Sequence, residues 1–383
     1  MDFDFDQRID RRSFWSTKWT RYPPDVLPFW VADMDFRAPE SIIDALRERV
    51  EHGIYGYTNT PNTVVQACLD WLNREFSWEI DPEWLVWLPG VVPAFNMACR
   101  LAGSPGTEVM IPVPVYHPFL AAPRHAQREA VFVDLKENER GWCMDFDAME
   151  AAVTARTRMC LVCNPQNPTG RVYTAQELTQ LGEFAARHDL LICSDEIHCA
   201  IILDATKSHT PIATLDRELA KRTITLMAPT KTFNIPGVGC AFAIIEDTEL
   251  RDRFRTARAG LVSGIGPLQF TACDAAFREQ GAWLPALLDY LRGNRDLLER
   301  TVAGIAGISM RHVEATFLGW IDTRELELDG PGAFFEQHGL GFSNGADFGK
   351  PGFVRFNFAC PRSLLREGLE RLEAAVSKAR SDL

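Results

Sequence analysis

Seven short apolar runs in the middle of the chain limit the possible folds more than any other feature. They occupy residues 84–88, 108–111, 130–134, 159–163, 190–194, 223–227 and 239–245. Most are nearly continuous in Val, Ile, Leu, Met and Cys, which is typical of strands buried on both faces. Such strands occur in mostly parallel sheets that helices cover on either side. We therefore predict an α/β domain with a mostly parallel seven-stranded sheet covered by helices.

Amphipathic stretches alternate with these runs. Residues 174–188 predict a helix. Thr174 at its start can serve as the N-cap, and Glu177 three residues later completes a capping box. Residues 145–155 predict a second helix, and the basic stretch 251–258 predicts one solvated helix face. The alternation of strands and helices indicates a doubly wound α/β domain.

The two ends of the chain differ from its middle. Residues 281–302 and 363–380 predict long amphipathic helices, with strands predicted between them at 316–322 and 352–358. A length of 383 residues suits two domains. We expect an N-terminal segment, residues 1–50, that packs on a small α+β domain of residues 281–383. Residues 51–280 then form the large domain.

Charge and cysteine usage exclude several classes of function. The net charge of −12 argues against nucleic acid or anionic lipid as a partner. No apolar run is long enough for a membrane span, and the acidic N-terminus lacks the features of a secretory signal. The ten cysteines are scattered in mostly apolar contexts, which favours a cytoplasmic location. Cys160 and Cys163 have CxxC spacing, but in a strand they point to opposite faces, so we predict no metal site.

Polar residues stand where several predicted strands end. Lys231 and Asn167 follow two of the apolar runs, Asp195 closes a third, and Arg355 lies in an aromatic-rich strand. Open α/β sheets bind ligands beyond the carboxyl ends of their strands. Burial there would lower the pKa of a lysine and free its amine to attack an aldehyde. Taken singly, these residues also fit a solvated loop lysine, a structural turn, a helix cap and a structural ion pair.

The order of these residues is more specific than any one of them. The strings NPQNPTG at 164–170, SDE at 194–196, TK at 230–231 and the strand around Arg355 occur in a fixed sequence. This set resembles the fold-type I pyridoxal-phosphate enzymes of the aspartate aminotransferase superfamily, class I/II. The resemblance extends over about residues 25–375.

Within this superfamily the chain is similar to the cystathionine β-lyase and cysteine C–S lyase branch. The supporting strings are FWVADMDF at 29–36, YGY at 55–57, PGVVP at 89–93, DEIH at 195–198, KTFNIPG at 231–237 and VRFNFACPR at 354–362. Three positions depart from the pattern of aspartate aminotransferases. Ala228, Gly239 and His198 stand where those enzymes have a serine, a phosphate-binding arginine and a tyrosine. These departures favour the lyase branch.

The resemblance implies a pyridoxal 5'-phosphate cofactor and catalytic roles for Lys231, Asp195 and Tyr116. Lys231 is expected to hold the cofactor as a Schiff base and then to act as the general base at the substrate Cα. Asp195 is expected to keep the pyridine nitrogen protonated, so that the ring accepts electrons. Asn167 is expected to bind the phenolic oxygen of the ring and to contact substrate, while Tyr116 stacks on the ring. Arg355 is expected to bind the substrate α-carboxylate.

The resemblance also implies contacts to the cofactor phosphate. The backbone N–H groups of Gly90, Val91 and Val92 are expected at a helix N-terminus, which favours anions. The hydroxyl of Thr230 adds to this set, and His198 is expected near the cofactor.

Three further residues are expected at the rim of the site. Tyr57 matches a tyrosine that reaches the phosphate of a neighbouring subunit, which implies a homodimer. Trp30 and Asp33 are expected near the mouth through which substrate enters.

The reaction that the resemblance implies is an α,β-elimination. L-cystathionine or a related L-cysteine S-conjugate would give pyruvate, ammonia and a thiol, which is homocysteine in the case of cystathionine. Two alternatives stay open: an aminotransferase that uses a 2-keto acid, and a regulatory or binding protein of the same fold. A nucleotide-binding protein is disfavoured, because no run is followed by GxGxxG or GxxxxGK[ST].

Overall fold

The seven predicted strands form one sheet in the computed structural model, which describes residues 3–381. The order across the sheet is β2-β10-β9-β8-β7-β3-β4. The strands are β2 (Leu85–Leu88), β3 (Glu108–Val113), β4 (Glu129–Asp134), β7 (Thr157–Cys163), β8 (Leu191–Asp195), β9 (Thr223–Met227) and β10 (Ala241–Ile244). The prediction of a seven-stranded α/β sheet is confirmed.

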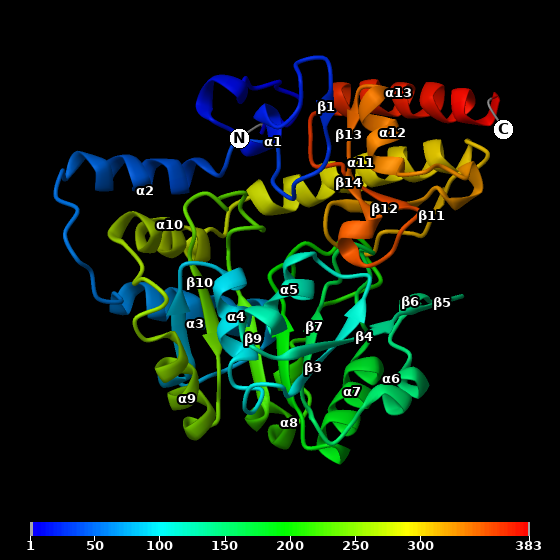
Figure 1. Cartoon of the computed structure of the whole chain (residues 1–383). Helices are drawn as coiled ribbons and strands as arrows, with labels where there is room; N and C mark the ends of the chain where they lie inside the picture. Colours follow the sequence, from blue (N-terminus) through cyan, green and yellow to red (C-terminus); the bar gives the residue numbers. More distant parts are fainter. Residues whose placement is uncertain (1–2, 382–383) are drawn as a thin grey trace.

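Only β10 breaks the parallel arrangement of this sheet, since it pairs antiparallel with both β2 and β9. The pairs β9–β8, β8–β7, β7–β3 and β3–β4 are parallel. The C-terminal ends of β2, β3, β7, β8 and β9 therefore lie at one edge of the sheet. This edge faces the smaller domain, which lies above the sheet in Figure 1.

Helices cover both faces of the sheet, as its apolar strands require. On one face lie α4 (Val91–Cys99), α5 (Pro118–His125) and α9 (Thr248–Arg258). On the other face lie α3 (Asn62–Phe76), α7 (Ala175–Arg187) and α10 (Pro267–Arg278), with the short α6 (Phe146–Ala152) and α8 (Arg217–Lys221). The predicted capping box is present, with Thr174 and Glu177 capping α7 reciprocally. Cys160 and Cys163 lie in the cores on opposite faces, as predicted.

The smaller domain contains an antiparallel sheet of order β11-β12-β15-β14. Its strands are β11 (Ser309–Met310), β12 (Leu318–Asp322), β14 (Ser343–Asn344) and β15 (Phe353–Asn357), and its helices are α11 (Trp283–Ala303), α12 (Pro331–Gln337) and α13 (Arg362–Ser381). The long helices and two strands agree with the predicted segments. A hairpin of β5 (Lys136–Asn138) and β6 (Gly141–Cys143) was not predicted. None of the helices within residues 3–381 is both long and apolar enough to cross a membrane.

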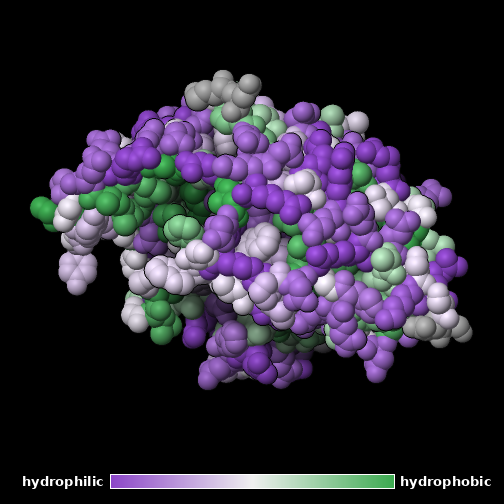
Figure 2. Space-filling view, turned by 90° about the horizontal axis from the view of Figure 1, so that it is seen from above, coloured by the Kyte–Doolittle hydropathy of each residue, from purple (hydrophilic) through white to green (hydrophobic). Residues whose placement is uncertain are grey.

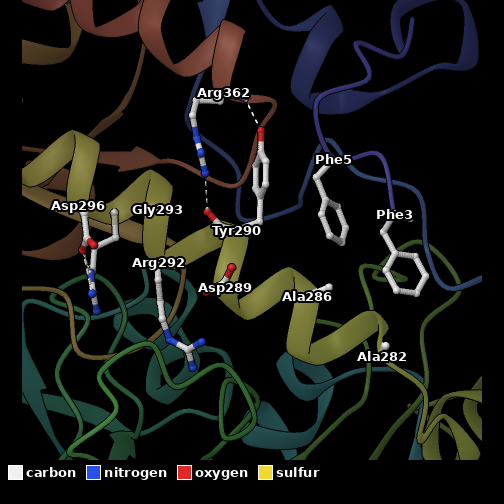
Figure 3. Close-up of a pocket in the computed structure, with 11 residues that line it drawn as sticks. Phe3, Phe5, Ala282, Ala286, Asp289, Tyr290, Arg292, Gly293, Asp296 and Arg362 are labelled. Carbon is white, nitrogen blue, oxygen red and sulfur yellow. Dashed lines mark hydrogen bonds and ion pairs between the residues drawn. The ribbon is translucent and has the colours of Figure 1, made fainter. Parts of the chain in front are cut away.

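The N-terminal segment packs on this domain. The ring of Phe5 lies 5.4 Å from that of Tyr290 on α11, and the Tyr290 hydroxyl accepts a 2.6 Å hydrogen bond from the Arg362 backbone N–H. Figure 3 shows these side chains around a surface cavity, with Phe5 facing α11. Further along, β1 (Leu27–Pro28) pairs with β13 (Leu340–Gly341), and α2 (Glu40–Glu51) leads into the large domain. The exact domain boundaries stay a prediction.

Buried ion pairs fix the segment that follows β1. Lys18, in the short helix α1 (Thr17–Thr20), is fully buried, and its Nζ lies 2.7 Å from Asp35 Oδ2. Arg11 Nη1 lies 2.6 Å from Asp35 Oδ1 and its Nη2 lies 2.8 Å from Asp33 Oδ2. Burial opposes ionisation of Asp35, but Lys18 and Arg11 outweigh it and hold the Asp35 pKa below its usual value. The ion pairs thus join the N-terminal segment to residues 30–36.

We predict that Lys18→Met lowers the free energy of unfolding by about 3 kcal/mol, because it leaves Asp35 buried with less compensation. Chemical denaturation of the purified variant measures this change. The matched control is Arg8→Met, which removes an exposed pair with Glu367 and should cost less than about 1 kcal/mol. Equal effects of the two substitutions would show that the Lys18 network contributes no more than a surface pair.

Candidate active site

Five of the predicted site residues meet at one edge of the sheet because their strands are parallel. Gly90, Tyr116, Asn167 and Lys231 follow β2, β3, β7 and β9, and Asp195 is the last residue of β8. The C-terminal edge of an open α/β sheet is where such folds bind ligands. The sheet therefore brings together residues that are far apart in sequence.

These side chains line one cavity of about 310 Å³. Residues of the smaller domain and of the segment after β1 close it from above. The predicted residues that line the cavity are Trp30, Gly90, Val91, Val92, Tyr116, Asn167, Asp195, His198, Thr230, Lys231 and Arg355.

Lys231 is held at this cavity with its amine partly removed from water. Its Nζ donates a 2.5 Å hydrogen bond to the carbonyl oxygen of Ala32. Burial lowers the Lys231 pKa to about 8, and the positive charge of Arg355 acts in the same direction, while Asp33 and Asp195 oppose the shift. A larger fraction of this amine is therefore neutral at pH 7 than for an ordinary lysine. A neutral amine is the form that attacks an aldehyde or accepts a proton.

Asp195 is buried without a cation in contact. Its Oδ1 accepts a 3.1 Å hydrogen bond from the Ile197 backbone N–H, and no lysine, arginine or histidine nitrogen lies within 4 Å among residues 3–381. Burial raises the Asp195 pKa to about 7. Burial also lowers the pKa of nearby His198 to about 3, so this imidazole is neutral and cannot supply the missing charge. A cationic group from a ligand would therefore stabilise the charged form of Asp195.

Arg355, in β15, is a buried cation without an anion in contact. Its Nη1 donates to Asn167 Oδ1 at 2.9 Å, and its Nη2 donates to the Trp30 carbonyl oxygen at 2.6 Å. Burial lowers the Arg355 pKa to about 10, so the guanidinium stays charged at neutral pH. No carboxylate lies within 4 Å of it in the described part of the chain. A buried guanidinium with neutral partners suits the carboxylate of a ligand.

The helix α4 begins at the cavity and offers backbone donors there. Gly90 is its N-cap, and Val91 and Val92 are its first residues. Their N–H groups have no acceptor within the helix, and the helix dipole favours an anion at this end. Gly239 also lines the cavity, with φ +58°, and a Cβ there would lie 2.8 Å from the Pro89 carbonyl oxygen. Any side chain at this position would therefore be strained, which is consistent with a glycine here.

Two predicted residues do not line the cavity of their own chain. Tyr57 is fully exposed, in the extended loop between α2 and α3. Asp33 lies next to Ala32, but its carboxylate pairs with Arg11. It acts on the cavity through its charge, which raises the Lys231 pKa.

Sequence reasoning missed several residues that shape the site. The Ser343 hydroxyl donates to the Trp30 carbonyl oxygen at 2.8 Å and lies 3.3 Å from Arg355 Nη2. His117 lines the cavity beside Tyr116, and the carbonyl of Ala32 accepts from Lys231. Because His117 directly follows Tyr116 in the sequence, its place at the cavity could have been predicted. Nothing in the sequence around Ser343 or Ala32 indicates their contacts.

The residues present fit pyridoxal 5'-phosphate. The uncompensated carboxylate of Asp195 suits a protonated pyridine nitrogen, the amine of Lys231 suits an aldehyde, and the start of α4 suits a phosphate. Arg355 remains for a substrate carboxylate. This fold and this set of residues define a pyridoxal-phosphate enzyme of fold type I.

Comparison with known proteins agrees with this class. The family model for aminotransferase class I and II matches residues 24–372, and the chain belongs to this family. It is 34% identical to cystathionine β-lyase PatB of Bacillus subtilis (strain 168), over 98% of this chain and 100% of that protein.

Solved structures are also similar over the full length. A crystal structure of OvoB has a TM-score of 0.95 and 47% identity, covering 98% of this chain and 99% of that one. Cystalysin from Treponema denticola, whose structure contains pyridoxal 5'-phosphate, has a TM-score of 0.93 and 31% identity, covering 99% and 100%.

We predict that Asp195→Asn stabilises the cofactor-free protein at pH 8 relative to wild type. The folded-state pKa of Asp195 lies above its unfolded value, so this residue's contribution to stability falls as the pH rises from about 4 to 7. Asparagine keeps the oxygen that accepts from Ile197 but has no charge, so the gain is on the order of 3 kcal/mol.

Denaturation of the cofactor-free proteins at pH 4.5 and pH 8 measures this effect. The difference between variant and wild type should be small at pH 4.5 and large at pH 8. A difference that does not change with pH would mean that Asp195 is not buried without a counterion.

Proposed function

We propose that this chain is a pyridoxal-phosphate-dependent carbon–sulfur β-lyase. Its substrates are L-cystathionine or related L-cysteine S-conjugates, and its products are pyruvate, ammonia and a thiol. One observation carries the proposal: a desolvated amine, a buried carboxylate without a cation and a buried guanidinium without an anion line the same cavity. The similarity to a cystathionine β-lyase over the full length supports the choice of reaction.

Each residue then has a task in the reaction. When bound, pyridoxal 5'-phosphate supplies an aldehyde for the lysine and substrate amines and a ring that withdraws electrons from the substrate Cα. Lys231 has a pKa of about 8, so its neutral amine can take the Cα proton at physiological pH. Asp195 supplies the negative charge at the base of the cavity that favours a protonated ring nitrogen. Loss of the thiolate from the β-carbon completes the elimination, and water then hydrolyses the released enamine to pyruvate and ammonia.

Arg355 orients the substrate. A carboxylate bound by its guanidinium places the amino acid beside Lys231, and Asn167 Oδ1 and the Trp30 carbonyl oxygen hold the guanidinium in place. Such positioning determines which bond at Cα points toward the base. Tyr116 lies over the same cavity from the end of β3 and is the candidate for stacking on the ring.

A product assay tests the proposed reaction. Purified protein with pyridoxal 5'-phosphate is given L-cystathionine or S-ethyl-L-cysteine, without a keto acid. We expect pyruvate, ammonia and free thiol in equal amounts over many turnovers, and no products from Lys231→Ala. Turnover that occurs only after a 2-keto acid is added would instead make this chain an aminotransferase.

We also propose that the active unit is a homodimer in which Tyr57 reaches the partner's cavity. Tyr57 is fully exposed, and Ile54 and Tyr55 beside it are also exposed. Hydrophobic residues gather on the side of the molecule where α2 and this loop lie (Figures 1 and 2). A free surface rarely exposes such aromatic residues side by side, so this loop suits a contact with a second copy.

Mixed dimers test this arrangement. We expect a particle of twice the 43.1 kDa chain mass by analytical ultracentrifugation, no activity for Lys231→Ala alone and weak activity for Tyr57→Ala alone. Co-expression of the two variants in equal amounts should restore about a quarter of the wild-type activity, because about half of the dimers are mixed and one of the two sites in each mixed dimer keeps both residues. No recovery on co-expression, or a monomer, would contradict the proposal.

The cysteines support a cytoplasmic location as part of the same proposal. All ten are buried and unpaired, which suits a reducing compartment. Cell fractionation with an antibody to the native protein tests the location, and recovery from an extracytoplasmic fraction would contradict it.

A further inference from the structure

Two buried carboxylates follow each other at the end of β8. Asp195 is the last residue of this strand, and Glu196 comes next and is completely buried. Successive side chains of a strand point to opposite faces. Asp195 lines the cavity, whereas Glu196 lies on the face of Ser194, whose hydroxyl donates a 2.9 Å hydrogen bond to Glu196 Oε1. The two acids therefore lie back to back, and only one of them faces the cofactor site.

The carboxylate of Glu196 has a partner that Asp195 lacks. Its Oε2 lies 2.7 Å from His209 Nε2, and its Oε1 also accepts a 3.1 Å hydrogen bond from the Ile212 backbone N–H. The side chain of His209 is only 1% exposed. No lysine or arginine nitrogen lies within 4 Å of Glu196 among residues 3–381. Because a carboxylate without solvent contact is costly to ionise alone, His209 is the group that can balance it.

The surroundings of this pair supply no other positive charge. The thiol of Cys199 stays neutral, since burial and the charge of Glu196 both raise its pKa, and the nearby Glu75 of α3 is an exposed acid. The ring of Phe76 lies 5.6 Å from that of His209, at an angle of 76°. An aromatic ring at this distance attracts a cation. His209 Nδ1 is buried and has no hydrogen-bond partner in the described part of the chain.

The charge of Glu196 bears directly on Asp195. Burial raises the Asp195 pKa to about 7, and the charge of Glu196 acts in the same direction. A like charge disfavours ionisation of a neighbouring acid. An unbalanced Glu196 would therefore draw a proton toward Asp195 and away from a ring nitrogen bound there. The ring accepts electrons well only while that nitrogen is protonated.

We infer that Glu196 and His209 hold one proton between them and form a pair without net charge, so that Asp195 alone carries a net negative charge at the end of β8. Both are positioning residues, because neither lines the cavity and both act through Asp195. The inference goes beyond the proposed reaction. It requires only the cofactor and applies to a lyase and to an aminotransferase alike.

The second ring nitrogen of His209 reports on the shared proton. In a pair without net charge, Nδ1 carries a hydrogen whether the shared proton lies on Glu196 or on Nε2. In a pair with one net negative charge, Nε2 carries the only ring hydrogen and Nδ1 is bare. The ¹⁵N NMR spectrum of holoenzyme labelled in its eight histidines measures this state at neutral pH, and His209→Gln identifies the signal. We expect a protonated Nδ1, and a bare Nδ1 would overturn the inference.

Substitutions test whether the charge of this pair reaches the cofactor. His209→Gln keeps a donor for Glu196 but cannot hold the shared proton. With cofactor labelled by ¹⁵N at its ring nitrogen, this variant should shift the ring signal toward the unprotonated form. It should also lower kcat for S-ethyl-L-cysteine about tenfold, with little change in KM. The double variant Glu196→Gln with His209→Gln removes the unbalanced charge and should restore the ring signal and most of kcat.

The matched control is His188→Gln. His188, the C-cap of α7, forms a contact of the same 2.7 Å length with Glu150 of α6 and does not line the cavity. This variant should change neither the ring signal nor kcat. A wild-type ring signal in His209→Gln, or a double variant no better than His209→Gln alone, would overturn the inference.

A further variant covers the case in which His209→Gln does not fold. Glu196→Gln alone should leave the ring signal unchanged, whereas a shift toward the protonated form would show that the wild-type pair carries a net charge and would overturn the inference. The ring signal does not depend on the reaction. A failed product assay therefore leaves this test in place, and a failure of this test leaves the β-lyase proposal intact.

Discussion

The burial of three ionisable groups at one edge of the sheet is the constraint on which the rest of this structure depends. Asp195 and Arg355 are buried, the amine of the partly buried Lys231 is desolvated, and none of the three has an oppositely charged partner within 4 Å among residues 3–381. Such burial costs several kcal/mol per charge unless a ligand supplies the missing partner. Asp195 ends β8 and Lys231 follows β9 of the large sheet, whereas Arg355 comes from β15 of the smaller domain. The cavity is therefore arranged for a ligand that carries charges of both signs, as a cofactor and an amino acid together do.

The segment of residues 30–36 links this cavity to the rest of the molecule. The carbonyl groups of this segment accept hydrogen bonds from Lys231 and Arg355. Side chains of both domains also bind it, because Asn234 donates to the Met34 carbonyl and Asn357 donates to the Asp33 carbonyl. The ion pairs of Arg11 and Lys18 with Asp33 and Asp35 also hold this segment. The small domain thus contributes Arg355 to the cavity, and its Asn357 helps to hold the backbone whose Ala32 carbonyl accepts from Lys231.

Much of this arrangement could be predicted from the sequence, because its signals are carried by side chains. Strands apolar on both faces predict a covered parallel sheet, and a sheet of that kind brings Asn167, Asp195 and Lys231 to one edge. The contacts of Ser343 and the Ala32 carbonyl could not be predicted. One is a common surface residue and the other is a backbone oxygen, and both depend on how two domains meet.

The central claim is that the desolvated amine of Lys231 is the point at which this cavity holds its cofactor. The most direct measurement is borohydride reduction of the protein with bound pyridoxal 5'-phosphate, followed by proteolysis and mass spectrometry. The account predicts a reduced cofactor adduct on the peptide that contains Lys231 and on no other lysine in stoichiometric amount. An adduct on an exposed lysine such as Lys221, or none at all, would contradict it.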